Sequence, residues 1–245
     1  MKKFLAIIIM TTTLSNTTLF AESDSEGGCS VDMNIDLTTA NIWRGSYLCG
    51  LSAQPSATLT IGGLSAGMWA STDLNNGDNG YTEIDFSLGY TLSAFTLTLT
   101  DYCWTADNGF DYCGKYNKNH YLEIGASISL SEFIDELNIT FGINTMMAGA
   151  CRNADDDAAY STFLSLDYEH TVGYVRLSAG IGASVEEKDV NFYSDKDGFR
   201  VVDLHASASR DISVGEHCGI SLGTTLTYNP TAKKMMFAAS AGLSF

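Results

Sequence analysis

Three residues of one short segment have the types that nucleophilic catalysis requires. Asp203, His205 and Ser207 are each separated by one residue, so on a β-strand their side chains would point to one side. A serine attacks only when its Oγ lies within hydrogen-bond reach of an oriented imidazole, and residues two apart on a strand are roughly 6.5–7 Å from each other. We therefore predict a polar strand face and no catalytic residue, with a hydrolase as the alternative.

Carboxylates on similar alternating segments indicate a different chemistry, the selection of ions by charge. The acidic positions are Asp32, Asp36, Glu83, Asp85, Glu123, Asp167 and Asp203. The basic groups that could form ion pairs with them are Arg44, Arg176 and His205. Carboxylates that line a narrow polar pore favour cations and repel anions. The alternative is that the arginines pair with the acids, which then only solvate the wall.

No segment has the composition of a metal or nucleic-acid site. Two acidic loops, 73–80 and 154–159, are interpreted as solvated, because the first lacks the terminal bidentate glutamate of a calcium loop. The six cysteines form no C-x-x-C pair and do not have zinc-site spacing. A net charge of −16 argues against nucleic-acid binding. We predict no metal, no cofactor and no nucleic-acid partner.

Twelve segments alternate apolar with polar or small residues at a period of two, which is the pattern of β-strands with one apolar face. They are 31–37, 57–61, 64–71, 82–90, 95–100, 122–130, 137–143, 162–168, 175–185, 202–209, 220–228 and 235–245. Short and long connections alternate between them. We predict an all-β fold, a transmembrane up-and-down antiparallel β-barrel of about 12 strands. A soluble lipocalin-like barrel or a sandwich is the alternative.

The parity of each strand assigns its two faces. We predict that the apolar parity faces lipid and that the polar parity faces the lumen. Aromatic residues of the lipid parity should form two girdles: Tyr90, Phe95, Tyr168 and Phe245 near the short turns, and Trp43 and Tyr228 near the long loops. The terminal Phe245 resembles the insertion signal of bacterial outer-membrane barrels, which predicts the outer-membrane assembly machinery as a partner.

The N-terminus has the features of a secretory signal peptide. Lys2 and Lys3 precede the apolar run 4–10, and we predict cleavage after Ala21. The predicted organisation is a signal peptide at 1–21, an N-terminal tail at 22–28 and a barrel domain at 29–245. Export followed by closure of a lipid-facing barrel predicts the cell outer membrane of a Gram-negative bacterium, with its lipid as a partner.

Barrel topology restricts how the cysteines can pair, because bridged Cα atoms must lie within about 7 Å of each other. Cys29 and Cys218 belong to the short-turn end, so each can pair only with the other. The long-loop end holds Cys49, Cys103, Cys113 and Cys151. We favour a Cys103–Cys113 bridge, which leaves Cys49–Cys151, and free thiols are the alternative.

Four motifs follow one another along 41–90. They are the pair Arg44–Gly45; Pro55; a Gly-x-Trp-x-Ser strand with Gly67, Trp69 and Ser71; and an acidic-x-Asp strand with Glu83 and Asp85 that ends in Gly89–Tyr90. This order resembles the TorF family of porins. Gln54 replaces the lysine usual before the proline, and the cysteines are not part of the family pattern. The resemblance implies an outer-membrane barrel and suggests a porin, without a substrate.

We therefore expect a porin that passes ions or small hydrophilic solutes through a narrow, acidic and cation-preferring lumen. Twelve strands enclose a lumen of roughly 10 Å, which Trp69 and Phe163 would narrow. Two alternatives stay open, an outer-membrane barrel hydrolase and a barrel plugged by its own loops that serves binding or structure. Conductance separates a porin from a plugged barrel, and lipid hydrolysis separates the enzyme from both.

Overall fold

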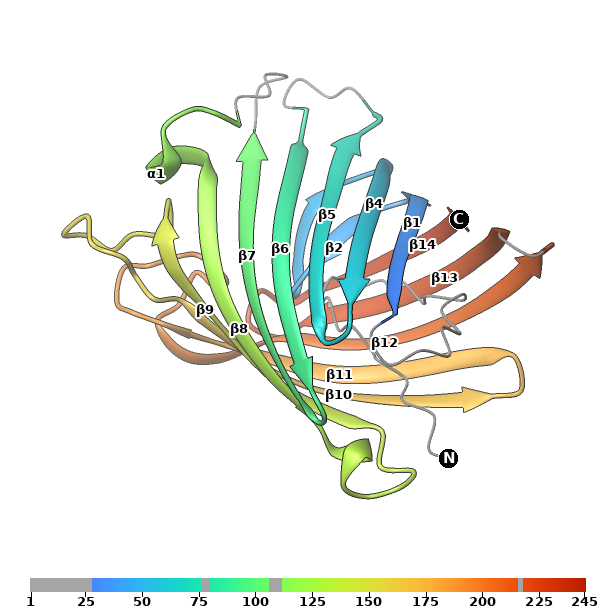
Figure 1. Cartoon of the computed structure of the whole chain (residues 1–245). Helices are drawn as coiled ribbons and strands as arrows, with labels where there is room; N and C mark the ends of the chain where they lie inside the picture. The colour runs from blue at the N-terminus through green and yellow to red at the C-terminus, as the bar shows by residue number, and fades with distance from the viewer. Residues whose placement is uncertain (1–27, 76–79, 106–111, 216–217) are drawn as a thin grey trace.

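A computed structural model describes residues 28–75, 80–105, 112–215 and 218–245, which form a closed antiparallel barrel of twelve strands (Figure 1). The predicted signal peptide, and the predicted tail except its last residue, lie outside these residues. The barrel strands are β1 (Cys29–Thr38), β4 (Ser52–Ile61), β5 (Leu64–Asp73), β6 (Thr82–Leu92), β7 (Phe95–Thr105), β8 (His120–Ser129), β9 (Ile139–Gly149), β10 (Thr162–Val172), β11 (Val175–Glu186), β12 (Gly198–Val214), β13 (Cys218–Asn229) and β14 (Lys234–Ser244). The remaining elements are β2 (Asn41–Trp43), β3 (Ser46–Cys49), helix α1 (Tyr116–Asn119) and the 3-10 turn η1 (Leu130–Glu132).

Each barrel strand pairs with the next one along the chain, and β1 closes the ring against β14. In the closing register Asn34 lies opposite Ser244, and on its other edge β1 pairs with β4 from Cys29 opposite Ile61. Strand β1 therefore begins beside the short turns, and strand β14 ends there. Closure leaves no free sheet edge, which a barrel in hydrocarbon requires. Among the described residues no helix is long and apolar enough to cross a membrane.

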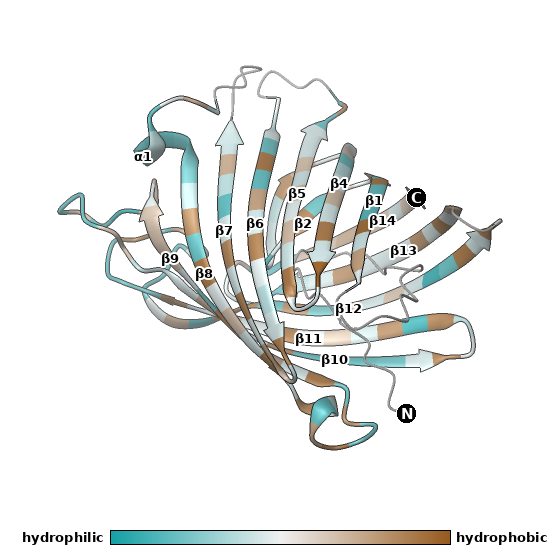
Figure 2. Cartoon of the chain, in the orientation of Figure 1, coloured by the Kyte–Doolittle hydropathy of each residue, from teal (hydrophilic) through white to brown (hydrophobic). Residues whose placement is uncertain are grey.

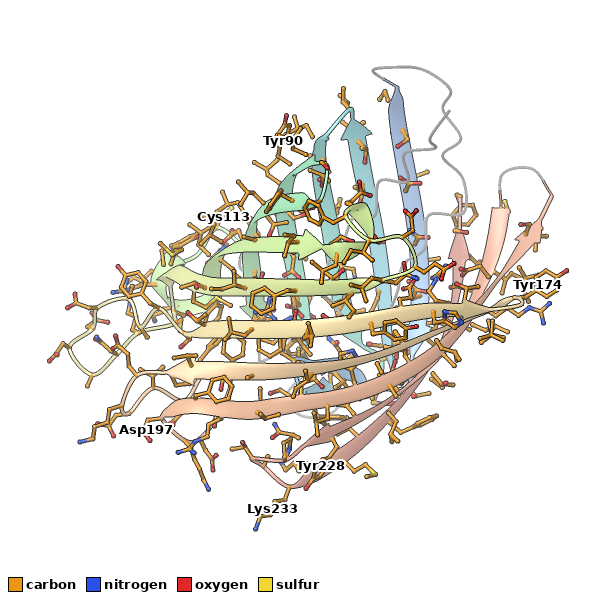
Figure 3. The ribbon with its side chains drawn as sticks, turned by 90° about the horizontal axis from the view of Figure 1, so that it is seen from below. Tyr90, Cys113, Tyr174, Asp197, Tyr228 and Lys233 are labelled. Carbon is orange, nitrogen blue, oxygen red and sulfur yellow. The ribbon has the colours of Figure 1, made fainter. Side chains whose placement is uncertain are left out.

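The predicted assignment of strand faces is confirmed. Figure 2 shows hydrophobic and hydrophilic residues alternating along the strands, and large apolar side chains such as Leu88, Leu97 and Leu222 are exposed on the outside. The outward aromatic residues near the short turns are Tyr90, Phe95, Tyr168 and Phe245, and Tyr228 is exposed near the long loops. Tyr90 and Tyr174 project away from the ribbon in Figure 3. An outer surface this rich in apolar side chains fits contact with lipid.

Two predicted lipid-facing residues are instead buried. Trp43 is 7% exposed because the chain turns inward after β1 and forms the hairpin β2–β3, which alternation did not predict. Val202 is fully buried because it is an extra residue in β12: Val201 pairs with Ala183 and Asp203 with Gly182, which leaves Val202 without a partner on β11. A bulge of this kind reverses the parity of the strand around it.

The assignment of faces predicts that a charged substitution changes the free energy of unfolding by different amounts at two adjacent positions. Leu99 lies near the middle of β7 and is 42% exposed on the outer face, whereas Thr100 lines the interior. Leu99→Arg should lower the free energy of unfolding by about 2–4 kcal/mol, because an arginine would face the middle of the bilayer. Thr100→Arg should cost much less, since its side chain enters a polar lumen. Urea titration in phospholipid vesicles measures both, and equal losses would contradict the assignment.

Candidate functional site: a hairpin across the lumen

The hairpin β2–β3 reaches across the barrel interior and ends in a two-residue turn, Arg44–Gly45. Both residues have positive φ, 48° and 77°, as two-residue turns of the favoured hairpin type require. The tip lies against the β12 bulge so closely that a Cβ on Gly45 would collide with the carbonyl oxygen of Val202. Asn229 on β13 donates a 3.0 Å hydrogen bond from Nδ2 to the Gly45 carbonyl. The tip is therefore seated on one wall of the barrel.

The Arg44 side chain extends from that tip to the facing wall. Its guanidinium donates to both carboxylate oxygens of Glu123 on β8, at 2.5 and 2.9 Å, and both side chains are almost fully buried. The hydroxyl groups of Tyr102 and Tyr193 also donate to Glu123, at 3.0 and 3.2 Å. Bidentate pairs of this kind are short and directional. They hold the hairpin to β8, while Gly45 lies against β12.

Tyr193 belongs to the β11–β12 loop, outside the barrel strands. Burial raises the pKa of its phenol well above the ordinary value, and the Arg44 guanidinium works against that shift. The hydroxyl therefore stays protonated and can donate to Glu123 while it accepts from Arg44. A second loop thus closes over the same ion pair.

Aromatic rings fill the space around Arg44. The guanidinium carbon lies 4.6 Å from the Trp43 ring centre and 4.8 Å from that of Phe163 on β10, distances that suit cation–π contact. Trp43 also contacts the rings of Tyr102, Trp104, Phe192 and Tyr193 at centroid distances of 5.4–6.1 Å. The buried cluster spans from β7 to β12 by way of the hairpin. It occupies the long-loop half of the lumen.

The other face of the hairpin packs on the closing strand. Ala40 and Ile42 form a small buried cluster with Ala238 of β14, and Asn41 donates a 3.4 Å hydrogen bond to Ser71 of β5. The hairpin thus contacts the wall on several sides. We name residues 39–51 between β1 and β4 the plug hairpin.

A polar cavity occupies the half of the lumen nearer the short turns. Its walls come from β4 to β10 and consist largely of hydroxyl groups with a few carboxylates. The lining side chains include Thr58, Ser65, Ser87, Thr98, Thr100, Tyr102, Asn144, Ser165, Asp85, Glu123 and Asp167. Glycines such as Gly67 keep this space open, because a Cβ there would approach the Ser87 Oγ to 2.8 Å. The cavity ends at Tyr102 and Glu123, where the plug hairpin begins.

The acidic residues predicted to line a pore all lie on the interior side of the wall, and they divide into two groups. The first group has a cationic partner. Glu123 pairs with Arg44. Asp167 lies 3.4 Å from Nε2 of His205, and Asp203 lies 3.2 Å from Nδ1 of the same ring. Arg176 pairs with Asp211 and Glu169. Within the described residues Asp32, Asp36, Glu83 and Asp85 form no ion pair. Pairing therefore accounts for only part of the acidic lining.

The geometry for serine catalysis is not present at the segment that could have supplied it. Both nitrogens of His205 are engaged by carboxylates, and the Ser207 hydroxyl lies 2.6 Å from the hydroxyl of Ser178 on β11. His205 therefore has no nitrogen directed at Ser207. These residues form a polar network on the wall.

None of the six cysteines is in a disulfide, so none of the predicted bridges is formed. The plug hairpin explains why the predicted Cys49–Cys151 bridge is not formed. It turns Cys49 toward Ser52 and Ser71. The Cys151 thiol instead donates to the hydroxyl of Ser161, beside β10, at 3.3 Å. The Cys103–Cys113 pair also stays open, with Cys103 buried at the barrel wall and Cys113 exposed in the loop that follows. Cys29 and Cys218 share the short-turn end as predicted, but β14 lies between their strands.

The residues of the TorF-like motifs lie in the plug hairpin and in strands β4, β5 and β6. Arg44 and Gly45 form the turn of this hairpin, and Pro55 lies opposite Ile35 in the β1–β4 pair. Gly67, Trp69, Ser71, Glu83, Asp85 and Gly89 face the interior, whereas Tyr90 faces out. The motif therefore describes the turn of the hairpin and part of the wall beneath it.

The fold and the site define a class: a closed twelve-stranded antiparallel β-barrel, apolar outside, with a polar cavity and an internal hairpin. The chain matches no family model and no curated protein, so the TorF resemblance stays a prediction. Similar solved structures include the KdgM porin, at 6% identity and a TM-score of 0.45 over 87% of this chain and 98% of that one. A triple mutant of the Rhodopseudomonas blastica porin aligns at 10% identity and a TM-score of 0.33 over 89% and 99%. At such low TM-scores, function has to be argued from the chain's own residues.

Proposed function

We propose that the protein is an outer-membrane channel for ions or small hydrophilic solutes, and that the plug hairpin closes its long-loop end in the conformation described. The observation that supports this most is the contrast between the two faces of the closed barrel. Large apolar side chains cover the outside, and hydroxyl and carboxyl groups line a cavity inside. A barrel that only bound a partner at its rim would not need a polar cavity along its axis.

We further propose that the channel prefers cations. Asp32, Asp36, Glu83 and Asp85 are interior carboxylates without an ion pair in the described residues, while Arg44 and Arg176 both have carboxylate partners. The unpaired acids leave a negative potential in the lumen, which lowers the energy of a cation there and raises that of an anion.

Reversal potentials test both parts of the proposal. The refolded protein, inserted in a planar bilayer under a KCl gradient, should give currents that reverse toward the K⁺ equilibrium potential. A reversal toward the Cl⁻ potential would contradict the cation preference. A correctly folded protein that never conducts would favour the plugged barrel that serves binding or structure, for which the hairpin across the lumen is the specific observation.

A further inference from the structure

Asp85 has an incomplete environment for a buried carboxylate. It lies on β6 with its side chain toward the cavity, and it is only 3% exposed. Its Oδ1 atom has no hydrogen-bond partner among the described residues. Burial of a carboxylate without compensating contacts is strongly unfavourable. The Oδ1 atom therefore lacks a partner on the described barrel wall.

The neighbouring charges do not fill this role. Glu83, two residues earlier on the same face, accepts from the hydroxyl of Tyr81 at 2.5 Å and from the indole of Trp104, and it shares a hydrogen bond with the Asp85 carboxyl group. As a second acid it supplies no positive charge. Glu123, which also lines the cavity, holds Arg44. The Arg44 guanidinium is thus committed to another carboxylate, and among the described residues no cation pairs with Glu83 or Asp85.

Two aromatic residues flank Asp85 on the interior face. The strand register places Trp69 of β5 on one side of Asp85 and Tyr102 of β7 on the other, and directly opposite residues of adjacent strands have Cβ atoms about 4.5–5.5 Å apart. Both aromatic residues are buried, and Tyr102 lines the cavity. A carboxylate between aromatic rings attracts organic cations, because the ring faces and the carboxylate all carry negative potential.

The chemistry of the pocket selects among cations. No group of three or more His, Cys, Asp or Glu in the described part of the chain could hold a metal ion. A divalent ion would find too few carboxylate ligands here. A primary ammonium group has three N–H donors, which can be directed to the free Oδ1 and to hydroxyl groups that line the cavity, and its carbon stem can lie against the rings. The hydroxyls of Ser87 and Thr100, which also line the cavity, suit a polar substituent.

We propose that Asp85, between Trp69 and Tyr102, is a binding site for small primary ammonium ions that enter the lumen from the short-turn end. The inference rests on the proposed function, since an ion reaches Asp85 only through a water-filled lumen. The site would hold such a solute directly beneath the plug hairpin, at the point where passage is blocked.

Isothermal titration of the detergent-folded protein tests the site with three probes. Ethanolammonium should bind, its neutral isostere ethylene glycol should not, and tetramethylammonium, which has no N–H donor, should bind roughly tenfold more weakly. Asp85→Asn should weaken ethanolammonium binding at least about tenfold, and it should fold, because an amide has nearly the same size and shape as the carboxyl group that it replaces. Asp197→Asn makes the same change of charge at an exposed loop position (Figure 3) and should leave binding unchanged.

Two results would overturn the proposal: unchanged ethanolammonium binding in Asp85→Asn, or displacement of ethanolammonium by an equal concentration of K⁺. Conductance measured on the same preparations distinguishes a failure of the proposed ammonium site from a failure of the proposed channel. A conducting protein that binds no ammonium ion would overturn the site alone, whereas one that binds it and never conducts would overturn the channel alone.

Discussion

Arg44→Asn should open the lumen and raise single-channel conductance severalfold. Asparagine tolerates the left-handed conformation of this position, and Asn-Gly is a favoured pair for such turns, so the turn itself should persist. Glu123 would then be buried without its cation, and breaking a buried pair in this way costs about 3–5 kcal/mol. Because β2 and β3 pair with each other and not with the strands of the barrel, we expect the hairpin to be displaced while the barrel stays folded.

A second variant separates the ion pair from the packing around it. In Arg44→Asn with Glu123→Gln neither charge is left alone, so the hairpin should return to the lumen and the conductance should fall back toward that of the unmodified protein. If the double variant conducts as freely as the single one, the aromatic packing around Trp43 and the guanidinium stem holds the hairpin, and the ion pair does not. Single-channel recording in planar bilayers measures both.

Gly45→Val should have an effect of similar size through sterics alone. A Cβ at this position meets the carbonyl of Val202, and a β-branched residue also strains a φ of 77°. The hairpin tip then cannot lie on β12, and we expect larger conductance with no loss of barrel strands by circular dichroism.

Gly62→Val is the matched control for that substitution. Gly62 also has a positive φ, 58°, but an added Cβ meets nothing within 4 Å, and the residue lies in a short turn far from the hairpin. The control should therefore carry the backbone strain without any change in conductance. Equal conductance in Gly45→Val and the unmodified protein would show that the tip does not have to be seated for the lumen to close.

The barrel was predictable because each strand has one apolar face, which points outward, and one polar face, which points into the lumen. Alternation such as Leu97–Thr98–Leu99–Thr100 fixes both the strand and its orientation, since a shift of one residue would reverse every side chain. The alternating connection lengths then give the order of strands around the ring. All twelve predicted segments overlap a barrel strand in the structure.

The plug hairpin was not predictable by the same means. Its strands have only three and four residues, and both faces are in contact with protein, so no period of two marks them. Extending the alternation of β1 through Trp43 placed that ring in lipid, whereas it packs around Arg44 inside the barrel. The Arg-Gly pair between two short apolar runs is the signal that could have indicated a two-residue turn.

Hydrogen-bond and ion-pair partners that come from distant segments could not be predicted from the sequence either. Tyr193 reaches Arg44 and Glu123 from a loop whose local sequence shows no pattern, and Asp211 pairs with Arg176 through the register of β11 and β12. Such contacts depend on how the ring closes, which alternation alone does not specify. The division of the lumen acids into paired and unpaired groups became visible only in the structure.

The most direct test of the account is single-channel recording of the unmodified protein and of Arg44→Asn in the same bilayer. We predict small or infrequent currents for the unmodified protein and large, sustained, cation-selective currents for the variant. The account would be contradicted if the unmodified protein conducts as fully as the variant, or if both are folded and silent.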